Sequence, residues 1–272
     1  MFVREKVIKA ILDSGENFMS GEQLSKKLGI SRTAVWKHIN ALREEGYNIE
    51  SVNKKGYRLA EKPDDILSSE NIAYNLPTEF IGKKVIHLDT VGSTNDYAKE
   101  IGNKVSGGTL IISEQQTKGK GRLGRVWKSK SGDGIWMSLI IKPKIEPYKA
   151  PFLTLVAGAS VVKALSNLDV EASIKWPNDI IVHNKKICGI LTELSAEMER
   201  VNYVVIGIGI NIKTIDFPDE IKEKATSLYK EGYKLSRVDI VRQFCIEFEK
   251  LYKGYILDGN KQDTLELCRK YS

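Results

Sequence analysis

The first 60 residues alternate between apolar helical patterns and short polar turns. Apolar side chains at positions 3, 7, 8, 11 and 12 recur at helical spacing, and Ser20 and Ser31 each stand where a serine would cap a following helix. Two strand-like runs, 49–52 and 56–59, come next and are joined by a basic turn. Three helices followed by such a hairpin predict a winged helix-turn-helix domain over residues 1–62.

From residue 84 onward, strand-like and helix-like segments alternate. The strand-like runs stand at 85–88, 109–113, 135–141, 173–176, 180–183, 187–194 and 203–208. One helical pattern ends at residue 101, a second covers 152–165 and a third lies around 240–252. Because only short turns separate the last four strands, they should pair antiparallel, which argues against a doubly wound nucleotide fold. We therefore predict an α+β chain: the winged domain, a linker at 63–67, and a mixed, largely antiparallel sheet flanked by helices over 68–272.

Composition narrows the class of protein without changing this architecture. The chain carries a formal charge of +7 and an isoelectric point near 9.1, which favours an anionic partner. The sequence contains no run of about 18 apolar residues and no signal-peptide-like N-terminus, so we expect a cytoplasmic protein without a membrane partner. Cys188, Cys245 and Cys268 are widely spaced, so we expect reduced thiols rather than a disulfide framework.

The winged domain has the charge and pattern of a DNA-binding module. Residues 1–62 hold 12 Lys and Arg against 8 Asp and Glu, an excess suited to phosphate contacts. If Val35, Ile39 and Leu42 face the core, other side chains of that helix face a major groove. The predicted DNA-contacting residues, on this helix and at the hairpin tip, are Arg32, Thr33, Trp36, Lys37, Asn40, Lys54 and Lys55. One such module buries only about 600–1,000 Å² on DNA, which favours a dimer that reads two half-sites; the alternative is a winged helix used for protein contact.

A basic, glycine-rich segment in the second domain carries the strongest chemical signal. It runs Gly119-Lys120-Gly121-Arg122-Leu123-Gly124-Arg125, is closed by Trp127, and lies in a stretch, 118–130, with six basic residues and no acidic one. Such a segment repels itself, so we expect it to order around a polyanion such as a nucleoside triphosphate; the alternative is a solvated basic loop. Its glycine spacing matches the dinucleotide fingerprint, but no strand precedes it and no helix follows, and it lacks the Lys and Ser or Thr of a P-loop.

Further motifs stand before and after this segment in a fixed order. They are Ser93-Thr94-Asn95, Gln116, Lys175-Trp176-Pro177-Asn178-Asp179, Lys186-Ile187-Cys188-Gly189-Ile190-Leu191 and Gly207-Ile208-Gly209-Ile210-Asn211. In this order and at these separations, with a winged helix in front, the set resembles the biotin protein ligases, in the bifunctional bacterial form that is also the biotin operon repressor. The resemblance covers nearly all of residues 1–272.

The resemblance implies a class II synthetase-like catalytic domain and a two-step reaction. Biotin and ATP give biotinyl-5′-adenylate and pyrophosphate, and a lysine of a biotin carboxyl carrier protein of acetyl-CoA carboxylase then takes the biotinyl group. It further implies Mg²⁺ as a cofactor, operator DNA as a partner, and a homodimer when the adenylate is bound as corepressor. Catalysis is then expected of the cations Lys120, Arg122 and Lys186, because fixed cations stabilise the charge of a phosphoryl-transfer transition state.

The resemblance also assigns residues to the two substrates. For biotin these are Ser93, Thr94, Asn95, Gln116, Lys120, Gly121, Arg122, Lys186 and Gly189. For ATP and the adenylate they are Gly119, Arg125, Trp127, Asn178, Asp179, Gly207, Gly209 and Asn211. Trp127 is expected to stack on adenine, and Asp179 is the candidate Mg²⁺ ligand. Each has a structural alternative: Trp127 and Trp176 as core aromatics, Asn178 as a turn former and Lys186 as a solvated charge.

Two features depart from the family pattern. Lys120 stands where arginine is common, which keeps the charge but loses the bidentate geometry. The family continues past the position of Ser272 into a small SH3-like β-barrel, which we do not expect within these 272 residues. Two other functions remain as alternatives. One is a non-catalytic biotin-sensing transcriptional regulator, against which Arg122, Lys186 and Asn211 together argue; the other is a lipoate ligase.

Overall fold

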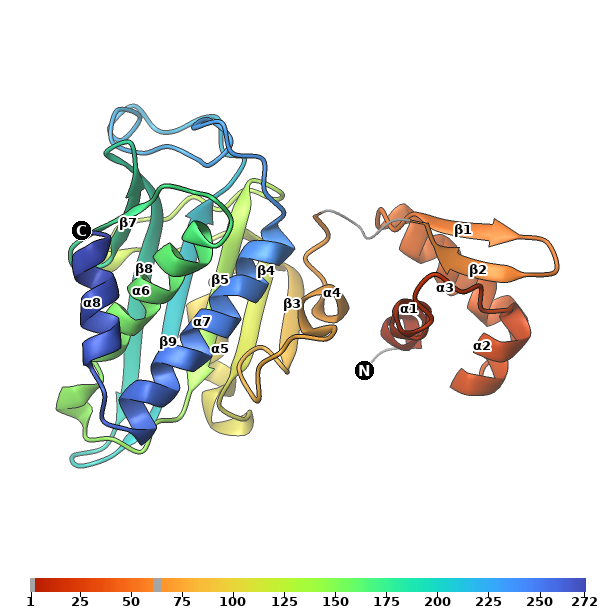
Figure 1. Ribbon diagram of the computed structural model, residues 1–272, viewed down its shortest axis with the longest axis horizontal. Helices are drawn as coiled ribbons and strands as arrows, with labels where there is room; N and C mark the ends of the chain where they lie inside the picture. Colours follow the sequence, from red (N-terminus) through yellow and green to blue (C-terminus); the bar gives the residue numbers. More distant parts are fainter. Residues whose placement is uncertain (1–2, 61–64) are drawn as a thin grey trace. The chain divides into compact units, whose positions relative to one another are not determined.

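The computed structural model describes residues 3–60 and 65–272 (Figure 1). Its contacts divide the chain into two compact units, and the division falls between Tyr74 and Asn75. Each unit buries a hydrophobic core of its own.

The first unit is a winged helix-turn-helix, as predicted. Its elements are α1 (Val3–Asp13), α2 (Gly21–Leu28), α3 (Arg32–Glu44), β1 (Ile49–Val52), β2 (Gly56–Leu59) and α4 (Ser69–Ala73). Ser20 caps α2 in a reciprocal capping box with Gln23, and Ser31 caps α3 by accepting from the backbone of Ala34 at 3.1 Å. β1 and β2 pair antiparallel, and the apolar face of α3 is buried in the core.

The short helix α4 packs with the winged helix. Tyr74 Oη, just after α4, donates to Leu12 O at 2.9 Å, and Tyr47 Oη donates to Ser68 Oγ at 2.8 Å. These contacts put the division after Tyr74, whereas the sequence prediction started the second domain at residue 68. Of the predicted linker, 63–67, residues 63 and 64 lie outside the described residues, as do 61 and 62 at the predicted end of the winged domain.

The second unit is built on one seven-stranded sheet. Its strands are β3 (Val85–Val91), β4 (Thr109–Gln116), β5 (Gly134–Ile141), β6 (Ser173–Lys175), β7 (Asp179–Val182), β8 (Lys185–Ala196) and β9 (Val201–Asn211). They run in the order β3-β4-β5-β9-β8-β7-β6; β3 and β4 pair parallel, and the other pairs are antiparallel. The predicted mixed, largely antiparallel sheet is confirmed. The run predicted to end at His183 stops one residue earlier, because His183 and Asn184 adopt positive φ in the turn to β8.

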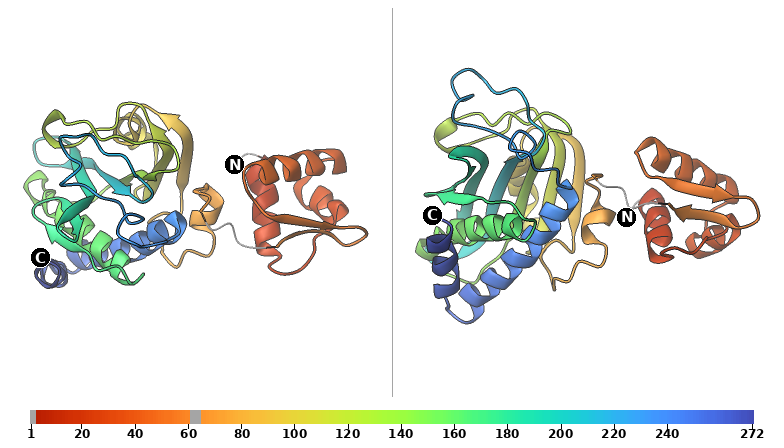
Figure 2. Two further views of the ribbon diagram at one scale, coloured as in Figure 1. Left: turned by 90° about the horizontal axis from the view of Figure 1, so that it is seen from above. Right: turned by 45° about the horizontal axis from the view of Figure 1, so that its top comes forward.

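Helices cover the two faces of this sheet unequally (Figure 2). α5 (Thr94–Ile101) packs on one face, and α6 (Phe152–Ser166), α7 (Arg237–Leu257) and α8 (Gln262–Lys270) pack together on the other. Thr192 on β8 bonds Thr154 of α6, while the next residue, Glu193, bonds α5. Side chains alternate along a strand, so these bonds set the two helices on opposite faces. Short 3-10 turns are η1 (Gly102–Lys104), η2 (Arg122–Gly124) and η3 (Pro147–Lys149).

The helix α6 is the buried helix that the apolar pattern predicted. In the described part of the chain, Pro147–Ser166 is the one stretch long and apolar enough to cross a membrane by length and composition alone. Most of it is buried inside the unit, however, as in the core helix of a globular domain. Gly158 of α6 faces Ile190 of β8, where an added Cβ would lie 3.8 Å from Ile190 Cδ1, an ordinary packing distance.

A buried ion pair fastens α7 to the sheet. Arg237, at the start of α7 and 5% exposed, donates to both carboxylate oxygens of Glu114 on β4, at 2.7 and 3.4 Å. Burial raises the pKa of Glu114, but the neighbouring His87 and Arg237 outweigh it and lower the pKa of this carboxyl to about 2. The charged pair therefore joins two elements that are distant in the sequence.

Acid should weaken the fold through this pair. The pKa of Glu114, about 2, lies below its ordinary 4.5, so its contribution to stability is complete above pH 4.5 and is lost as the pH falls toward 2. We expect Glu114→Gln to lower the free energy of unfolding at pH 7 by about 2–3 kcal/mol. Urea unfolding across this pH range measures the effect. If the variant loses as much stability on acidification as the parent, Glu114 is not the group responsible.

Candidate active site

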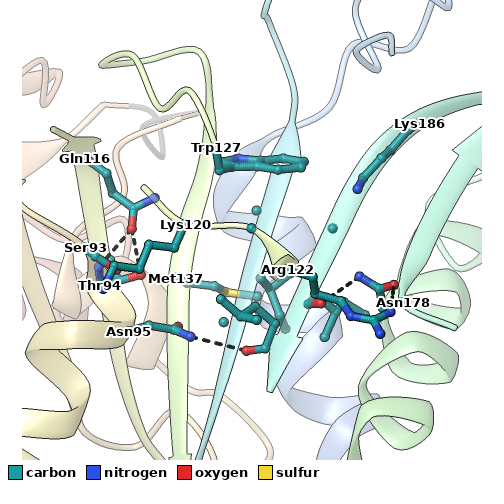
Figure 3. A pocket seen from close by; sticks show the side chains of 17 residues that line it. Ser93, Thr94, Asn95, Gln116, Lys120, Arg122, Trp127, Met137, Asn178 and Lys186 are labelled. Atoms are coloured by element: carbon teal, nitrogen blue, oxygen red, sulfur yellow. Dashed lines mark hydrogen bonds between the residues drawn. The ribbon is translucent and has the colours of Figure 1, made fainter. Parts of the chain in front are cut away.

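A pocket opens on the α5 face of the sheet (Figure 3). The predicted residues that line it are Ser93, Thr94, Asn95, Gln116, Lys120, Gly121, Arg122, Trp127, Asn178, Lys186, Gly189, Gly207 and Gly209. Four further residues complete the lining: Ile190, Leu191 and Ile208, which belong to the motifs but had no predicted role, and Met137, which the sequence did not single out. Gly119, Arg125, Asp179 and Asn211 were predicted at the site but are not part of this lining.

The N-terminus of α5 supplies one polar wall of the pocket. Ser93 caps the helix by accepting from the backbone of Asp96, which turns Thr94 and Asn95 toward the sheet. The amide oxygen of Gln116, at the end of β4, accepts from Thr94 N at 2.8 Å and from Thr94 Oγ1 at 3.1 Å. Its amide nitrogen donates to Ser129 Oγ at 2.8 Å. The polar residues predicted to meet biotin are thus brought together on one side, in a fixed orientation.

Two residues that the sequence did not reveal hold Asn95 in place. Ser138, buried on β5, lies 2.6 Å from Asn95 Oδ1 and 2.8 Å from Thr94 Oγ1. Asn95 Nδ2 donates to Glu193 of β8 at 2.8 Å and to the backbone oxygen of Leu191 at 3.3 Å. Both ends of the Asn95 amide are therefore satisfied within the protein, so this side chain orders the pocket wall. Ser138 gave no signal because it is a single serine inside an apolar run.

The glycine-rich loop, residues 118–130, closes over the pocket. Gly121 N donates to Arg125 O at 2.7 Å and Trp127 N to Gly119 O at 2.9 Å, which folds the loop back on itself. Lys120 reaches α5, with Nζ 2.6 Å from Asp96 Oδ2, and Arg122 reaches Asn178, with Nη1 2.7 Å from Oδ1. Arg125 remains exposed at the outer edge of the loop. Two cations of the loop are thus directed at opposite ends of the pocket.

Trp127 lies over a pair of glycines in the sheet. Gly189 and Gly209 are register partners on β8 and β9. A Cβ at Gly209 would lie 2.5 Å from the Trp127 Nε1, and one at Gly189 would lie 2.9 Å from its ring. The glycines therefore make room for the indole ring on the sheet. The Nε1 of Trp127 is buried without a hydrogen-bond partner.

The neighbours of Trp127 include the predicted catalytic lysine. Lys186 Nζ lies 5.2 Å from the Trp127 ring centroid and 2.7 Å from Asp179 Oδ1, within ion-pair distance although not in hydrogen-bonding geometry. Trp127 also packs edge-to-face with Trp136, whereas Trp176 is 49% exposed and is not a core aromatic. Lys186 is therefore oriented by a carboxylate and an aromatic face, not left as a solvated charge.

Asn178 and Asn211 are both tied to the backbone. Asn178 Nδ2 donates to Ile190 O at 3.0 Å, so Asn178 links Arg122 to the sheet. Asn211 is buried, and its Nδ2 donates to Thr226 O at 3.1 Å. It fixes the segment that follows β9 rather than lining the pocket.

Comparison with known proteins agrees with this geometry. Residues 88–211 match the biotin/lipoate A/B protein ligase family, and residues 3–58 match a helix-turn-helix domain family. Over 262 residues the chain is 46% identical to the bifunctional ligase/repressor BirA of Bacillus spizizenii, an alignment that covers 94% of this chain and 80% of that protein. The chain belongs to the bifunctional biotin protein ligase family.

The chain is also similar to more distant biotin protein ligases. The bifunctional ligase/repressor BirA of Escherichia coli is 37% identical over 230 residues, 84% of this chain and 70% of that protein. A solved structure of the biotin protein ligase from Aquifex aeolicus, in complex with biotin and ATP, is 36% identical with a TM-score of 0.56. That match covers 64% of this chain and 72% of the other. Family membership therefore rests on sequence and on fold.

In this biotin protein ligase, two lysines share the carboxylate of Asp96. Lys120 lies 2.6 Å from it, and Lys99, on the same helix, lies 3.1 Å from it. Partial burial raises the pKa of Asp96, but the hydrogen bonds from Lys120 and Lys99 outweigh it and hold the pKa below its ordinary value. Lys99 in turn contacts Glu193 at 2.7 Å. A continuous polar network therefore runs from Gln116 through α5 to the glycine-rich loop.

The winged helix of this biotin protein ligase presents the predicted DNA-contacting residues at its surface. Arg32, Thr33, Trp36, Lys37, Lys54 and Lys55 are exposed, and Asn40 is half-buried. Arg32 is paired with Glu22 at 2.6 Å, and Trp36 is 54% exposed. Lys54 adopts a left-handed φ of 66° at the hairpin tip, and Lys55 Nζ lies 5.9 Å from the ring centroid of Phe18.

Proposed function

We propose that this chain joins biotin to a lysine of a biotin carboxyl carrier protein in two steps, the first of which consumes ATP, and represses transcription with the adenylate as corepressor. The observation that carries the proposal is the convergence of cations and neutral polar groups on one pocket. Thr94 and Gln116 lie on one side of it and Arg122 and Lys186 on the other, with Trp127 between Gln116 and Lys186 (Figure 3). Neutral groups suit a ureido ring, and cations suit carboxylate and phosphate oxygens.

In the first step, an oxygen of the biotin carboxylate attacks the α-phosphorus of ATP. The bond from that phosphorus to the bridging oxygen of pyrophosphate breaks, and biotinyl-5′-adenylate is left. Because two anions must approach each other, the task of the protein is to neutralise charge. Lys186 and Arg122 supply fixed cations for the carboxylate and the α-phosphate, and Lys120 adds a third from the loop. Asp179 and Asn178 keep the first two in place.

In the second step, the amine of the carrier lysine attacks the acyl carbon of the adenylate. The carbon–oxygen bond to phosphate breaks, AMP leaves with the electron pair, and the nitrogen loses a proton as the amide forms. The adenylate is a mixed anhydride that water would hydrolyse, so the glycine-rich loop protects it until the carrier arrives. Trp127 is our candidate for stacking on the adenine; Gly209 makes room for its ring on the sheet, and Gly207 makes room for the side chain of Asn95.

The residues present fit Mg²⁺ as a companion of the nucleotide phosphates. Among the residues that the structure describes, no group of three or more His, Cys, Asp or Glu side chains is arranged to hold a metal ion. Asp179 is paired with Lys186, so it offers at most one carboxylate oxygen. Mg²⁺ commonly binds through one or two carboxylates together with substrate phosphates, and its role there is to neutralise phosphate charge. We therefore assign Asp179 as a single Mg²⁺ ligand.

The repressor role rests on the winged helix and its relatives. We propose that α3 and the wing read operator DNA through Arg32, Thr33, Trp36, Lys37, Asn40, Lys54 and Lys55. A homodimer formed by the adenylate-bound protein joins two such domains, because one module alone buries too little surface for tight specific binding. We place this function in the cytoplasm, with no membrane partner. Linkage then requires that operator binding tighten the hold on the adenylate by the same factor.

Pyrophosphate release tests the proposal directly. Protein mixed with biotin and ATP should release pyrophosphate in an amount that does not exceed the bound adenylate until a carrier protein is added. A regulator that only senses biotin releases none, and that result would reject the ligase function. A competition experiment between lipoate and biotin distinguishes a biotin ligase from a lipoate ligase. Preferred adenylation of lipoate would identify the chain as a lipoate ligase instead.

A further inference from the structure

Asp96 is a charged residue beside the pocket that the reaction itself does not require. It lies in the first turn of α5, directly after Ser93-Thr94-Asn95, and its carboxylate contacts Lys120 Nζ at 2.6 Å. Within the described residues, Lys120 is the single cation of the glycine-rich loop that pairs with a carboxylate; Arg122 is bonded to the neutral amide of Asn178. We propose that Asp96 is a positioning residue that holds the glycine-rich loop over the pocket, through Lys120, before the substrates bind.

The charge of the loop explains why such a contact is needed. Residues 118–130 hold six basic residues and no acidic one, so the loop repels itself when no anion is near. Three glycines between 119 and 124 add to the entropy that ordering the loop must overcome. A carboxylate fixed on α5 offsets part of both costs, because α5 is anchored by its Ser93 cap and by its packing on the sheet.

The partners of Asp96 explain how the loop can still respond to a ligand. Lys99 Nζ lies 3.1 Å from the same carboxylate and 2.7 Å from Glu193. When Lys120 turns from Asp96 to the phosphate or carboxylate oxygens of the adenylate, Asp96 keeps Lys99 as its counter-ion. Asp96 and Glu193 then share the one positive charge of Lys99, and water screens the partly exposed carboxylate of Asp96, so the exchange costs little free energy. The side chains of Asp96 and Lys120 are 39% and 48% exposed, which keeps the contact weak and exchangeable.

The consequence for the reaction rests on the proposed function. A loop that is already held in place loses less entropy when biotin binds, so the carboxylate of Asp96 lowers the KM for biotin. Once the ligand is bound, its own anionic groups hold Lys120, so the rate of adenylate formation at saturation does not depend on Asp96. Asp96 therefore acts on KM and not on kcat.

Limited proteolysis of the ligand-free full chain tests the contact without reference to activity. Trypsin cleavage after Arg122 and Arg125 should be about two- to fivefold faster in Asp96→Asn than in the parent, as expected for the loss of one exposed ion pair. Asp96→Glu should restore most of the protection. Asp89→Asn removes the same charge from an exposed position on β3 and should leave the cleavage rate unchanged. Equal rates for Asp96→Asn and Asp89→Asn would overturn the proposal, as would faster cleavage at basic sites throughout the chain.

A double-mutant cycle shows whether Asp96 acts through Lys120. In a Lys120→Gln background, adding Asp96→Asn should change neither the cleavage after Arg125 nor the KM for biotin, because the contact is already gone. A further increase in either one would mean that Asp96 acts by another route. In the otherwise unchanged protein, Asp96→Asn should raise the KM for biotin about two- to fivefold and leave kcat unchanged. If the chain releases no pyrophosphate, the proposed function fails, while the proteolysis still decides the contact.

Discussion

Replacing Arg122 with alanine should slow the formation of biotinyl-5′-adenylate by about 10²–10³-fold, which corresponds to about 2.7–4 kcal/mol of transition-state stabilisation. Arg122 lines the pocket and is held at 2.7 Å by Asn178, so its guanidinium is oriented before charge develops on the α-phosphate. The same change removes a contact between the loop and the sheet. Adenylate that does form should therefore escape into solution, where it can be measured together with pyrophosphate release.

The matched control for Arg122 is another cation of the same loop. Lys128 is exposed and does not line the pocket, so Lys128→Ala removes one positive charge without touching the site. Its rate of adenylate formation should stay close to that of the parent. If Arg122→Ala keeps the parental rate and retains its adenylate, or if Lys128→Ala is equally slow, Arg122 has no specific role and the loop contributes only general positive charge.

Reversing the charge of the wing tip should weaken operator binding strongly. Lys54 and Lys55 are exposed at the tip of the β1–β2 hairpin, so Lys54→Glu with Lys55→Glu replaces two phosphate contacts by repulsion. We expect a loss of about 10²-fold or more in affinity, with the slope of log K against log salt reduced by about 2. Fluorescence anisotropy with operator DNA at several salt concentrations, in the presence of biotin and ATP, measures both quantities.

A second charge reversal makes the wing experiment specific. Lys6→Glu with Lys9→Glu changes the net charge by the same amount on α1, at exposed positions outside the predicted DNA-contacting set. This variant should keep most of its operator affinity and its salt slope. Both variants should release pyrophosphate at the parental rate, because the substitutions lie in the first unit. An equal loss of affinity in the two variants would mean that net charge, and not the wing, carries the binding.

Local patterns predicted most of the fold. The caps of α2 and α3 lie at Ser20 and Ser31, as the sequence indicated, because capping depends on residues three positions away. The strands of the sheet were found for the same reason, since alternation and turn residues are local. The two elements that escaped prediction, α4 and α8, are short and largely polar. Their places are set by tertiary contacts, such as that of Tyr74 with Leu12, which no local pattern records.

The sequence predicted most of the residues that line the pocket but not the contacts between them. Thirteen of the predicted residues line it, because the motifs stand at strand ends and turns that the sheet brings together. Ser138 and Glu193 were missed because their roles depend on the register that sets β5, β9 and β8 side by side. Asp96 was not singled out from the sequence, since its partner Lys120 lies in a different segment. Contacts between distant segments are what the sequence alone could not supply.

The two glycines beneath Trp127, Gly189 and Gly209, limit how mutation can change the size of the pocket. Gly189 and Gly209 already carry the smallest side chain there is, so mutation cannot enlarge the pocket on that side. Any bulkier residue at either position would meet the indole and push it, with the attached loop, away from the sheet. On this side of the pocket, space for a larger acid can come only from Trp127 itself, and a variant with a smaller residue there would lose the platform assigned to the adenine. The space available to the substrate on this side and the binding of the nucleotide therefore depend on the same aromatic ring.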